Sequence, residues 1–528
     1  MDAVMDAERV AASGTTHFFS AGDNVPMLLA DCARRTPSHV YCKAEGIDVT
    51  YADLAARVSH AAALLHAQGV RHGLHVGVML AHHLDHIVTF FALMRLGAVL
   101  VPLNTALRGS GLAHIVAHAH PDFLVVDAAF ALQVAEVIAL RGAAMTTIWR
   151  KPAHGTGQME TALYAGRAPT PAPDVPQSDT TLRQILYTSG TTGLAKGVVM
   201  PDRMIRAAAL GSTWVGNITP GSVLHFWDPI YHVFGTEVLV LALMVPVTLV
   251  LVPRFSASRL WDEARENRVS HIHFVGGVLQ LLLKQPPSPG DRTHGVKIAW
   301  GGGCPVEIWR AFEDRFGVRI HEGYGMTETS SFSTINPEGK LGSIGRAVAY
   351  FDVELVDDQG RKTPIGEPGE LRVRGREPGV LVPRYYNNPE ATAAALKDGW
   401  LYTGDLARQD AGGYFFFLGR KKDSLRRRGE NVSAWEVERV FNEHPDVEEC
   451  ALVGVKNEFA DEDLKLFVKR RDPALTEAQL IAWAQPKMAA FQLPRFVKFV
   501  DAFQKTPTER IQKQFLSRSI DDCWDKEK

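Results

Sequence analysis

From Thr50 onward, stretches with the apolar spacing of helices alternate with short apolar runs typical of buried strands. Residues 51–70 (YADLAARVSHAAALLHAQGV) predict a helix, residues 75–80 (HVGVML) predict a strand, and residues 90–104 (FFALMRLGAVLVPLN) predict a helix that runs into a strand. Such repetition is typical of parallel sheets whose faces are covered by helices. At 528 residues the chain is too long for one hydrophobic core. We therefore predict an α/β fold with at least two domains.

The residue pattern of the sequence changes after Gly399. Short strands, turns and charged residues follow, and residues 433–445 begin with a capping box and predict a helix. The remainder resembles a small α+β unit of roughly a hundred residues. We predict a large N-terminal domain of helix-covered sheets over residues 1–421 and a small α+β C-terminal domain over residues 422–528.

Composition narrows the classes of function. Apolar residues make up 46% of the chain and charged residues 22%, and the formal net charge is -2, so no general attraction for nucleic acid is expected. The longest apolar run, residues 238–252, is shorter than a bilayer span and is broken by Pro246; it predicts a buried helix followed by a buried strand. Five scattered cysteines without a C-x-x-C pair and the acidic start of the chain favour a cytoplasmic protein.

Residues 187–197 read YTSGTTGLAKG and combine three glycines, four serine or threonine hydroxyls and a lysine. Glycines let backbone N–H groups approach an anion, hydroxyls add donors, and lysine adds a mobile positive charge, so this segment is a candidate phosphate-binding loop. It does not have the spacing of a Walker loop. A glycine-rich turn in a connection is the alternative. The preceding residues predict a strand that delivers the loop at its carboxyl end, where open α/β sheets bind ligands.

Two further segments offer carboxylates that suit a nucleotide. Thr327 and Glu328 follow a Gly-Tyr-Gly turn, where a carboxylate is a candidate ligand for Mg²⁺ bound to phosphates, although a capped helix start is the alternative. Asp405, in YTGD, suits the two hydroxyls of a ribose, and an Asp turn is the alternative. His114 and His118 have helical i, i+4 spacing, but no carboxylate or cysteine joins them, so a zinc site is improbable.

Taken together, four ordered segments resemble one family. The segments YTSGTTGLAKG, GYGMTET, YTGD and GRKKDSLRRRGEN are similar to motifs of the adenylate-forming superfamily of acyl-CoA synthetases, luciferases and peptide-synthetase adenylation domains. Residues 284–305 (KQPPSPGDRTHGVKIAWGGGCP) and residues 521–527 (DDCWDKE) resemble the crotonobetaine/carnitine-CoA ligase type. The resemblance implies a large adenylate-forming N-terminal domain and a mobile C-terminal lid domain.

The resemblance also implies an activity. A carboxylic acid, ATP and CoA would give acyl-CoA, AMP and pyrophosphate through an acyl-adenylate, with Mg²⁺ as cofactor. The substrate would be a small carboxylic acid, because Trp227, residues 275–277 and residues 300–303 are expected to shape the acyl pocket. The alternative is an adenylation-impaired nucleotide- or acyl-CoA-binding protein that acts as a sensor or partner subunit. Neither the particular acid nor the oligomeric state follows from these motifs.

Site residues are carried over from the resemblance position by position. Glu328 would meet Mg²⁺, Gly429 would lie where the pantetheine arm passes, and Lys422 would be the hinge of the lid. The expected nucleotide-binding residues are Thr188, Ser189, Gly190, Thr191, Thr192, Gly193 and Lys196 for the phosphates and Asp405 with Arg420 for the ribose. Gly302, Gly303 and Tyr324 would flank the adenine, and Gly325 and Thr327 belong to the turn that follows Tyr324.

Two further candidate site residues are His232 and Arg510. His232, in PIYHVFG, is a candidate gate or acyl contact, with a satisfied core histidine as the alternative. Near the C-terminus, in KTPTERIQK, Arg510 stands where the superfamily usually has a lysine that bridges the substrate carboxylate and the α-phosphate. Guanidinium is a wide planar fork, whereas ammonium is a compact charge, so the exchange is not conservative. We therefore predict weak adenylation beside an intact thioester step.

Overall fold

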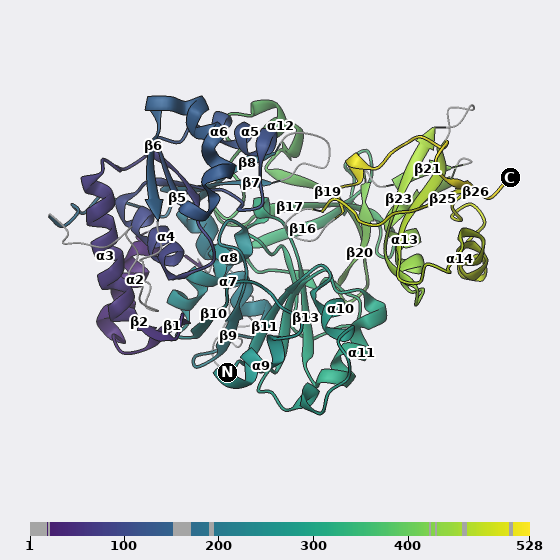
Figure 1. The fold of residues 1–528 in the computed structure, drawn as a ribbon, viewed down its shortest axis with the longest axis horizontal. Helices are drawn as coiled ribbons and strands as arrows, with labels where there is room; N and C mark the ends of the chain where they lie inside the picture. Colours follow the sequence, from purple (N-terminus) through teal and green to yellow (C-terminus); the bar gives the residue numbers. More distant parts are fainter. Residues whose placement is uncertain are drawn as a thin grey trace.

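The computed structural model describes residues 18–19, 22–150, 170–188, 195–421, 424–427, 430–456, 462–505 and 511–527. A large N-terminal domain of sheets and helices is followed by a smaller C-terminal domain, which lies at one end of the molecule (Figure 1). The predicted α/β fold class and its division into a large and a small domain are therefore confirmed.

A six-stranded sheet belongs to the first part of the chain. Its strands are parallel except for the last pair, β7 and β8, which run antiparallel. In spatial order the strands are β6 (Thr146–Arg150), β5 (Phe123–Asp127), β3 (His75–Met79), β4 (Val99–Pro102), β7 (Leu182–Thr188) and β8 (Lys196–Pro201).

A nine-stranded sheet forms the second layer. Its centre is parallel, and antiparallel strands close both edges. In spatial order the strands are β15 (Arg346–Ala347), β14 (Thr334–Asn336), β13 (Arg319–Tyr324), β12 (Ile298–Gly302), β11 (His271–Val275), β9 (Val223–Phe226), β10 (Thr248–Leu251), β1 (Val40–Ala44) and β2 (Ile47–Thr50).

Helices pack against these sheets, and one continuous hydrophobic core includes residues of both sheets and of helices α3, α4, α7 and α8. The helices of the N-terminal domain are α2 (Val25–Arg35), α3 (Tyr51–Ala67), α4 (Leu84–Leu96), α5 (Gly109–Ala119), α6 (Ala131–Arg141), α7 (Asp202–Val215), α8 (Val233–Met244), α9 (Leu260–Asn267), α10 (Val278–Leu283), α11 (Val306–Phe316) and α12 (Pro389–Ala395). Short 3₁₀ turns are η1 (Ala128–Phe130), η2 (Gly142–Ala144), η3 (Pro289–Arg292), η4 (Thr327–Thr329), η6 (Gln485–Lys487) and η7 (Lys513–Phe515).

The elements predicted from the apolar pattern are present. Helix α3 begins at a capping box in which Thr50 accepts from the backbone N–H of Asp53, and strand β3 follows it. The long apolar run divides at Pro246 into helix α8 and strand β10, because proline cannot continue a helix. Among the described residues, no helix combines the length and hydropathy that a bilayer crossing requires.

Smaller sheets lead from the large domain to the small one. The strands of the third sheet are β16 (Phe351–Val356), β17 (Gly369–Gly375), β18 (Leu396–Lys397), β19 (Trp400–Gln409) and β20 (Phe415–Arg420). The C-terminal domain contains the pair β21 (Ser424–Arg427) and β22 (Glu430–Ser433), the sheet of β23 (Val447–Lys456), β24 (Glu462–Arg470), β25 (Phe496–Phe499) and β26 (Trp524–Asp525), and the helices α13 (Ala434–Asn442) and α14 (Glu477–Ala484).

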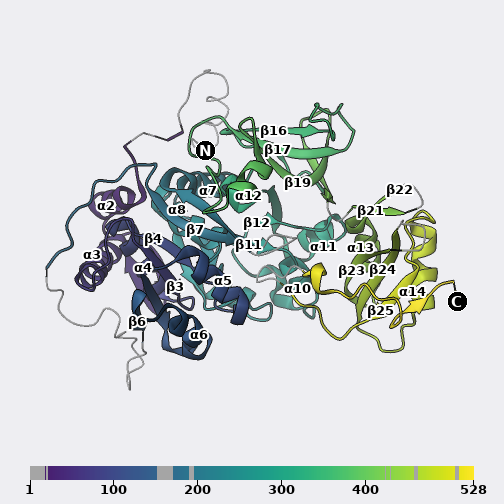
Figure 2. The same cartoon turned by 90° about the horizontal axis from the view of Figure 1, so that it is seen from above.

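The C-terminal domain contacts the N-terminal domain through α13, which lies beside α11 (Figure 2). Arg439 on α13 forms an ion pair with Glu307 on α11, with Nε 2.8 Å from Oε1. The ring of Trp435 meets Phe417 of β20 edge-on, with ring centroids 6.0 Å apart. Lys422, the expected hinge, lies outside the described residues.

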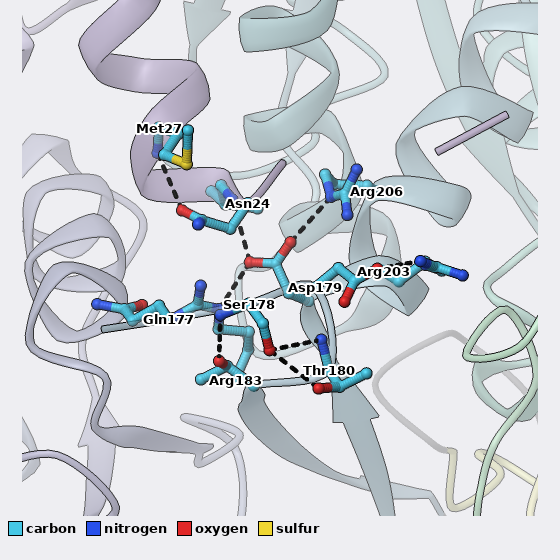
Figure 3. Close-up of polar contacts among 12 residues, drawn as sticks. Asn24, Met27, Gln177, Ser178, Asp179, Thr180, Arg183, Arg203 and Arg206 are labelled. Atoms are coloured by element: carbon cyan, nitrogen blue, oxygen red, sulfur yellow. Dashed lines mark hydrogen bonds and ion pairs between the residues drawn. The ribbon is translucent and has the colours of Figure 1, made fainter. Parts of the chain in front are cut away.

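A buried ionic cluster joins three elements of the N-terminal domain. Asp202, in the first turn of α7, accepts from Arg183 of β7 at 2.7 Å and from Arg206 at 2.9 Å. The same carboxylate accepts from the backbone N–H of Val25 at 3.0 Å, so α2 is held there as well. Arg183, Arg206 and Asn24 approach one another from these three elements (Figure 3). Asp202 and Arg183 are fully buried.

We expect Asp202→Ala to lower the free energy of unfolding by about 3 to 5 kcal/mol, because it leaves two buried guanidinium groups without their carboxylate. Urea unfolding followed by fluorescence measures the effect. Asp174→Ala is the matched control, since Asp174 pairs with Arg95 while its side chain is 95% exposed. That change is expected to cost about 1 kcal/mol at most. Equal shifts for the two variants would contradict a stabilising role of the buried cluster.

Candidate active site

The candidate phosphate loop connects two antiparallel strands. Thr188 ends β7 and lies opposite Lys196, which begins β8. The two ends of the loop are therefore adjacent, as in a hairpin. Ser189, Gly190, Thr191, Thr192 and Gly193 lie outside the described residues, and their assignment to phosphate binding stays a prediction.

Lys196 and Glu328 are linked by a tyrosine. The Nζ of Lys196 lies 4.3 Å from the ring centroid of Tyr385. The hydroxyl of Tyr385 donates to Oε1 of Glu328 at 2.8 Å. Glu328 and Thr327 lie in turn η4, directly after strand β13, and both are buried. A cation, an aromatic hydroxyl and a carboxylate thus meet beside one end of the candidate phosphate loop.

The protonation of Glu328 reflects opposing effects. Burial raises the pKa of its carboxyl group above the usual value, and the hydrogen bond from Tyr385 and the charges of Lys196 and Arg420 oppose this rise. A bound cation would further favour the ionised form. Mg²⁺ usually binds through one or two carboxylates together with phosphate oxygens, so a single buried carboxylate beside a phosphate loop fits this ion.

A second carboxylate lies on the neighbouring sheet. Asp405 of β19 is opposite Arg420 of β20, and Arg420 Nε lies 3.3 Å from Oδ1 of Asp405. The hydroxyl of Tyr324, at the end of β13, donates to Oδ2 of Asp405 at 2.6 Å. Burial and the nearby carboxylate raise the pKa of the Tyr324 hydroxyl, so it remains a donor. The structure brings Tyr324, Asp405 and Arg420 together, and their assignment to adenine and ribose stays a prediction.

The glycine segment after β12 is held by a glutamate. Glu322 accepts from the backbone N–H of Gly303 at 2.9 Å and from that of Cys304 at 3.1 Å. Burial raises the pKa of Glu322 to about 8, although these two hydrogen bonds favour the charged form. Gly303 has φ +93°, which favours glycine. Gly302 ends β12 in the same segment.

Gly325 marks a close approach of two backbone segments. A Cβ added there would lie 1.7 Å from the carbonyl oxygen of Ser331, so no side chain fits. This packing brings the turn that carries Glu328 against the chain that follows it. The glycine is therefore required by backbone contact, whether or not it also contacts a nucleotide.

His232 begins helix α8. Its Nδ1 accepts from the backbone N–H of Phe234 at the long distance of 3.5 Å, and its ring stacks on Phe234 with centroids 5.3 Å apart. Phe234 in turn contacts His273, whose ring lies 4.5 Å from Trp300. His232 is half-buried at one end of this aromatic series. Its assignment as an acyl contact stays a prediction.

The sequence did not indicate two features of the site. Tyr385 is 57 residues from Glu328 along the chain, and no local motif points to their contact. Glu322 precedes the Gly-Tyr-Gly turn, but its bonds to the glycine segment depend on the pairing of neighbouring strands β12 and β13. Gly429 and Arg510 lie outside the described residues, so their roles stay predictions.

The fold and the site together define an α/β enzyme of the AMP-binding class. Residues 29–386 match the family model of AMP-binding enzymes, and residues 436–510 match that of the AMP-binding enzyme C-terminal domain. The chain belongs to the AMP-binding enzyme family.

Individual relatives agree with this assignment. Crotonobetaine/carnitine–CoA ligase of Salmonella paratyphi A is 31% identical over 508 residues, which cover 94% of this chain and 96% of that protein. The solved structure of ATP-bound MatB from Rhodopseudomonas palustris has 28% identity and a TM-score of 0.83, and the match covers 93% of this chain and 98% of MatB. O-succinylbenzoate coenzyme A synthetase (MenE) of Bacillus subtilis, in complex with ATP and magnesium ion, has 25% identity and a TM-score of 0.81, with coverage of 93% and 98%. This protein is an ATP-dependent acyl-CoA ligase.

Proposed function

We propose that the chain converts a small carboxylic acid to its CoA thioester in two steps, with the assigned residues in the roles described below. The observation that carries the proposal is the pair of buried carboxylate sites: Glu328 with Tyr385 near Lys196, and Asp405 with Tyr324 and Arg420. The first site lies beside Lys196, at one end of the candidate phosphate loop, and the second joins strand β13 to strands β19 and β20.

In the first step, a carboxylate oxygen of the acid attacks the α-phosphorus of ATP. The bond from this phosphorus to the bridging oxygen breaks, and pyrophosphate leaves with the electron pair. Thr188 and Lys196 at the ends of the loop, with residues 189–193, would bind the β- and γ-phosphates. Asp405 would accept from the ribose hydroxyls, and Arg420 forms an ion pair with that carboxylate.

In the second step, the sulfur of CoA attacks the carbonyl carbon of the acyl-adenylate, the thiol proton is lost, and AMP leaves. Gly429 would leave room for the pantetheine arm, because glycine has no side chain. Gly302, Gly303 and Tyr324 would flank the adenine, and Thr327 would contact phosphate. Glu328 would hold Mg²⁺, whose charge offsets that of phosphate oxygens when it is bound.

The proposed acid is small. Trp227 is half-buried and Trp300 is fully buried near the aromatic series that begins at His232, so bulky side chains fill this region. MenE is described with ATP and magnesium ion, and the Salmonella paratyphi A relative is named for crotonobetaine and carnitine, which supports ATP, CoA and Mg²⁺ as the co-substrates and cofactor here. The five cysteines are free thiols, which supports a cytoplasmic location.

Purified protein incubated with ATP, CoA, Mg²⁺ and a panel of short-chain, cyclic, aromatic and betaine-type acids tests the proposal. We expect AMP, pyrophosphate and an acyl-CoA with at least one small acid. Formation of ADP in place of AMP would refute it. ATP binding without turnover on any acid would favour a sensor or partner subunit.

We also propose that the two domains meet at residues 421 and 422 and that Lys422 is the hinge of the lid. Proline fixes φ, so Lys422→Pro is expected to slow CoA transfer from a supplied acyl-adenylate at least about tenfold more than it slows pyrophosphate release. Lys422→Ala, which keeps φ free, is the control and should leave both rates near the native values. Equal slowing of both steps by proline would contradict the hinge assignment.

A further inference from the structure

Two histidines of helix α5 contact the two ends of the candidate phosphate loop. The Nε2 of His114 lies 3.0 Å from the carbonyl oxygen of Ala195, directly after the loop. The Nδ1 of His118 lies 2.7 Å from the hydroxyl of Tyr187, directly before Thr188. The two imidazoles stack with ring centroids 5.7 Å apart, because positions i and i+4 share one face of a helix.

His118 also contacts a third segment. Its ring meets Tyr386 edge-on with centroids 5.6 Å apart, next to Asn387 in the chain. In the neutral imidazole whose Nδ1 carries no proton, Nδ1 accepts from the hydroxyl of Tyr187. Partial burial lowers the pKa of His118, and burial raises that of the Tyr187 hydroxyl, which agrees with a neutral imidazole that accepts from a phenol.

Residues 385–387 connect this contact to Glu328. The backbone N–H of Tyr386 donates to the carbonyl oxygen of Gly197 at 2.7 Å, so this segment lies along β8. Its neighbour Tyr385 donates to Glu328 and lies over Lys196. Asn387, the next residue, has φ +43°, a left-handed conformation that asparagine tolerates.

We propose that His118, supported by His114, is a positioning residue that holds both ends of the phosphate loop and the Tyr385 segment in register for the β- and γ-phosphates of ATP. Neither histidine is assigned a contact with a nucleotide. His118 acts through the hydroxyl of Tyr187 on one side and through the ring of Tyr386 on the other. This inference rests on the proposed function of the loop.

Binding measurements separate this role from general packing. AMP has only the α-phosphate, whereas ATP also presents the β- and γ-phosphates to the loop. His118→Leu removes the polar contact with Tyr187 and keeps an apolar body of similar reach. Calorimetry with Mg²⁺ present measures both affinities. We expect the Kd for ATP to rise about fivefold to tenfold, which is the effect of losing one hydrogen bond that positions the loop, while the Kd for AMP changes less than about twofold.

Two further variants test the inference if His118→Leu disturbs folding. Tyr187→Phe removes only the hydroxyl and should reproduce most of the loss in ATP affinity. His118→Gln offers an acceptor and a donor on one amide and should recover part of it. His120→Asn is the matched control, since His120 ends α5 in a left-handed conformation and contacts Arg141 rather than the loop.

The outcomes distinguish this inference from the proposed function. Unchanged ATP affinity in both His118→Leu and Tyr187→Phe would overturn the inference, as would an equal loss of ATP and AMP affinity. A native protein that binds ATP but makes no acyl-CoA from any acid would refute the proposed function, while the comparison of ATP with AMP would still decide the role of His118.

Discussion

Replacing Glu328 by glutamine is expected to reduce pyrophosphate release at least about a hundredfold. Glutamine has the same shape, and its carbonyl oxygen still accepts from Tyr385, so the local structure should persist. The substitution removes the negative charge that would hold Mg²⁺ at the phosphates. Electrostatic groups of this kind contribute about 3 to 4 kcal/mol to the stabilisation of a transition state.

The control for this prediction is another buried glutamate. Glu237 of α8 is fully buried and accepts from the hydroxyl of Ser212 at 2.7 Å, and burial raises its pKa well above the usual value. Because burial disfavours the charged form of Glu237, Glu237→Gln should leave pyrophosphate release within about threefold of the native rate. If Glu328→Gln behaves like Glu237→Gln, Glu328 does not bind the metal ion of the first step.

The second large effect concerns Arg510. We expect Arg510→Ala to reduce pyrophosphate release about a hundredfold, and Arg510→Lys to raise it above the native rate. A compact ammonium group fits between a carboxylate and an α-phosphate better than a planar guanidinium does. Misplacement of such a charge by about an ångström costs on the order of a hundredfold.

The two half-reactions must be measured separately. Pyrophosphate release reports the first step, and CoA transfer from a supplied acyl-adenylate reports the second. The thioester step should remain within about twofold of native in both Arg510 variants if the arginine acts only in adenylation. Full pyrophosphate release by Arg510→Ala would show that Arg510 lies outside the active site during this step.

Local sequence patterns predicted most of the fold. Apolar spacing located α3, β3 and β7, and Pro246 located the break between α8 and β10. These features depend on the intrinsic preferences of neighbouring residues and on which face of an element is apolar, so a short window contains the information. The order of four motifs predicted the family and the activity class.

The pairing of the site residues was only partly predictable. The resemblance placed Asp405 near Arg420, and their strands are adjacent in the sequence. It contained nothing about Tyr385 as the partner of Glu328, or about Tyr324 donating to Asp405 from a different sheet. Likewise, the spacing of His114 and His118 was considered only as a metal site, whereas the structure places both against the ends of the candidate phosphate loop.

The sequence by itself determined the helix and strand pattern, the division into a large and a small domain, and which residues are candidates for binding phosphate and ribose. Only the tertiary structure decided which of these residues meet. The contacts of Asp202 with Arg183, of Tyr385 with Glu328 and of His118 with Tyr187 join elements that are brought together by the packing of different layers. A buried polar group must find a partner wherever the packed core offers one, and that choice depends on the whole fold rather than on neighbours in the chain.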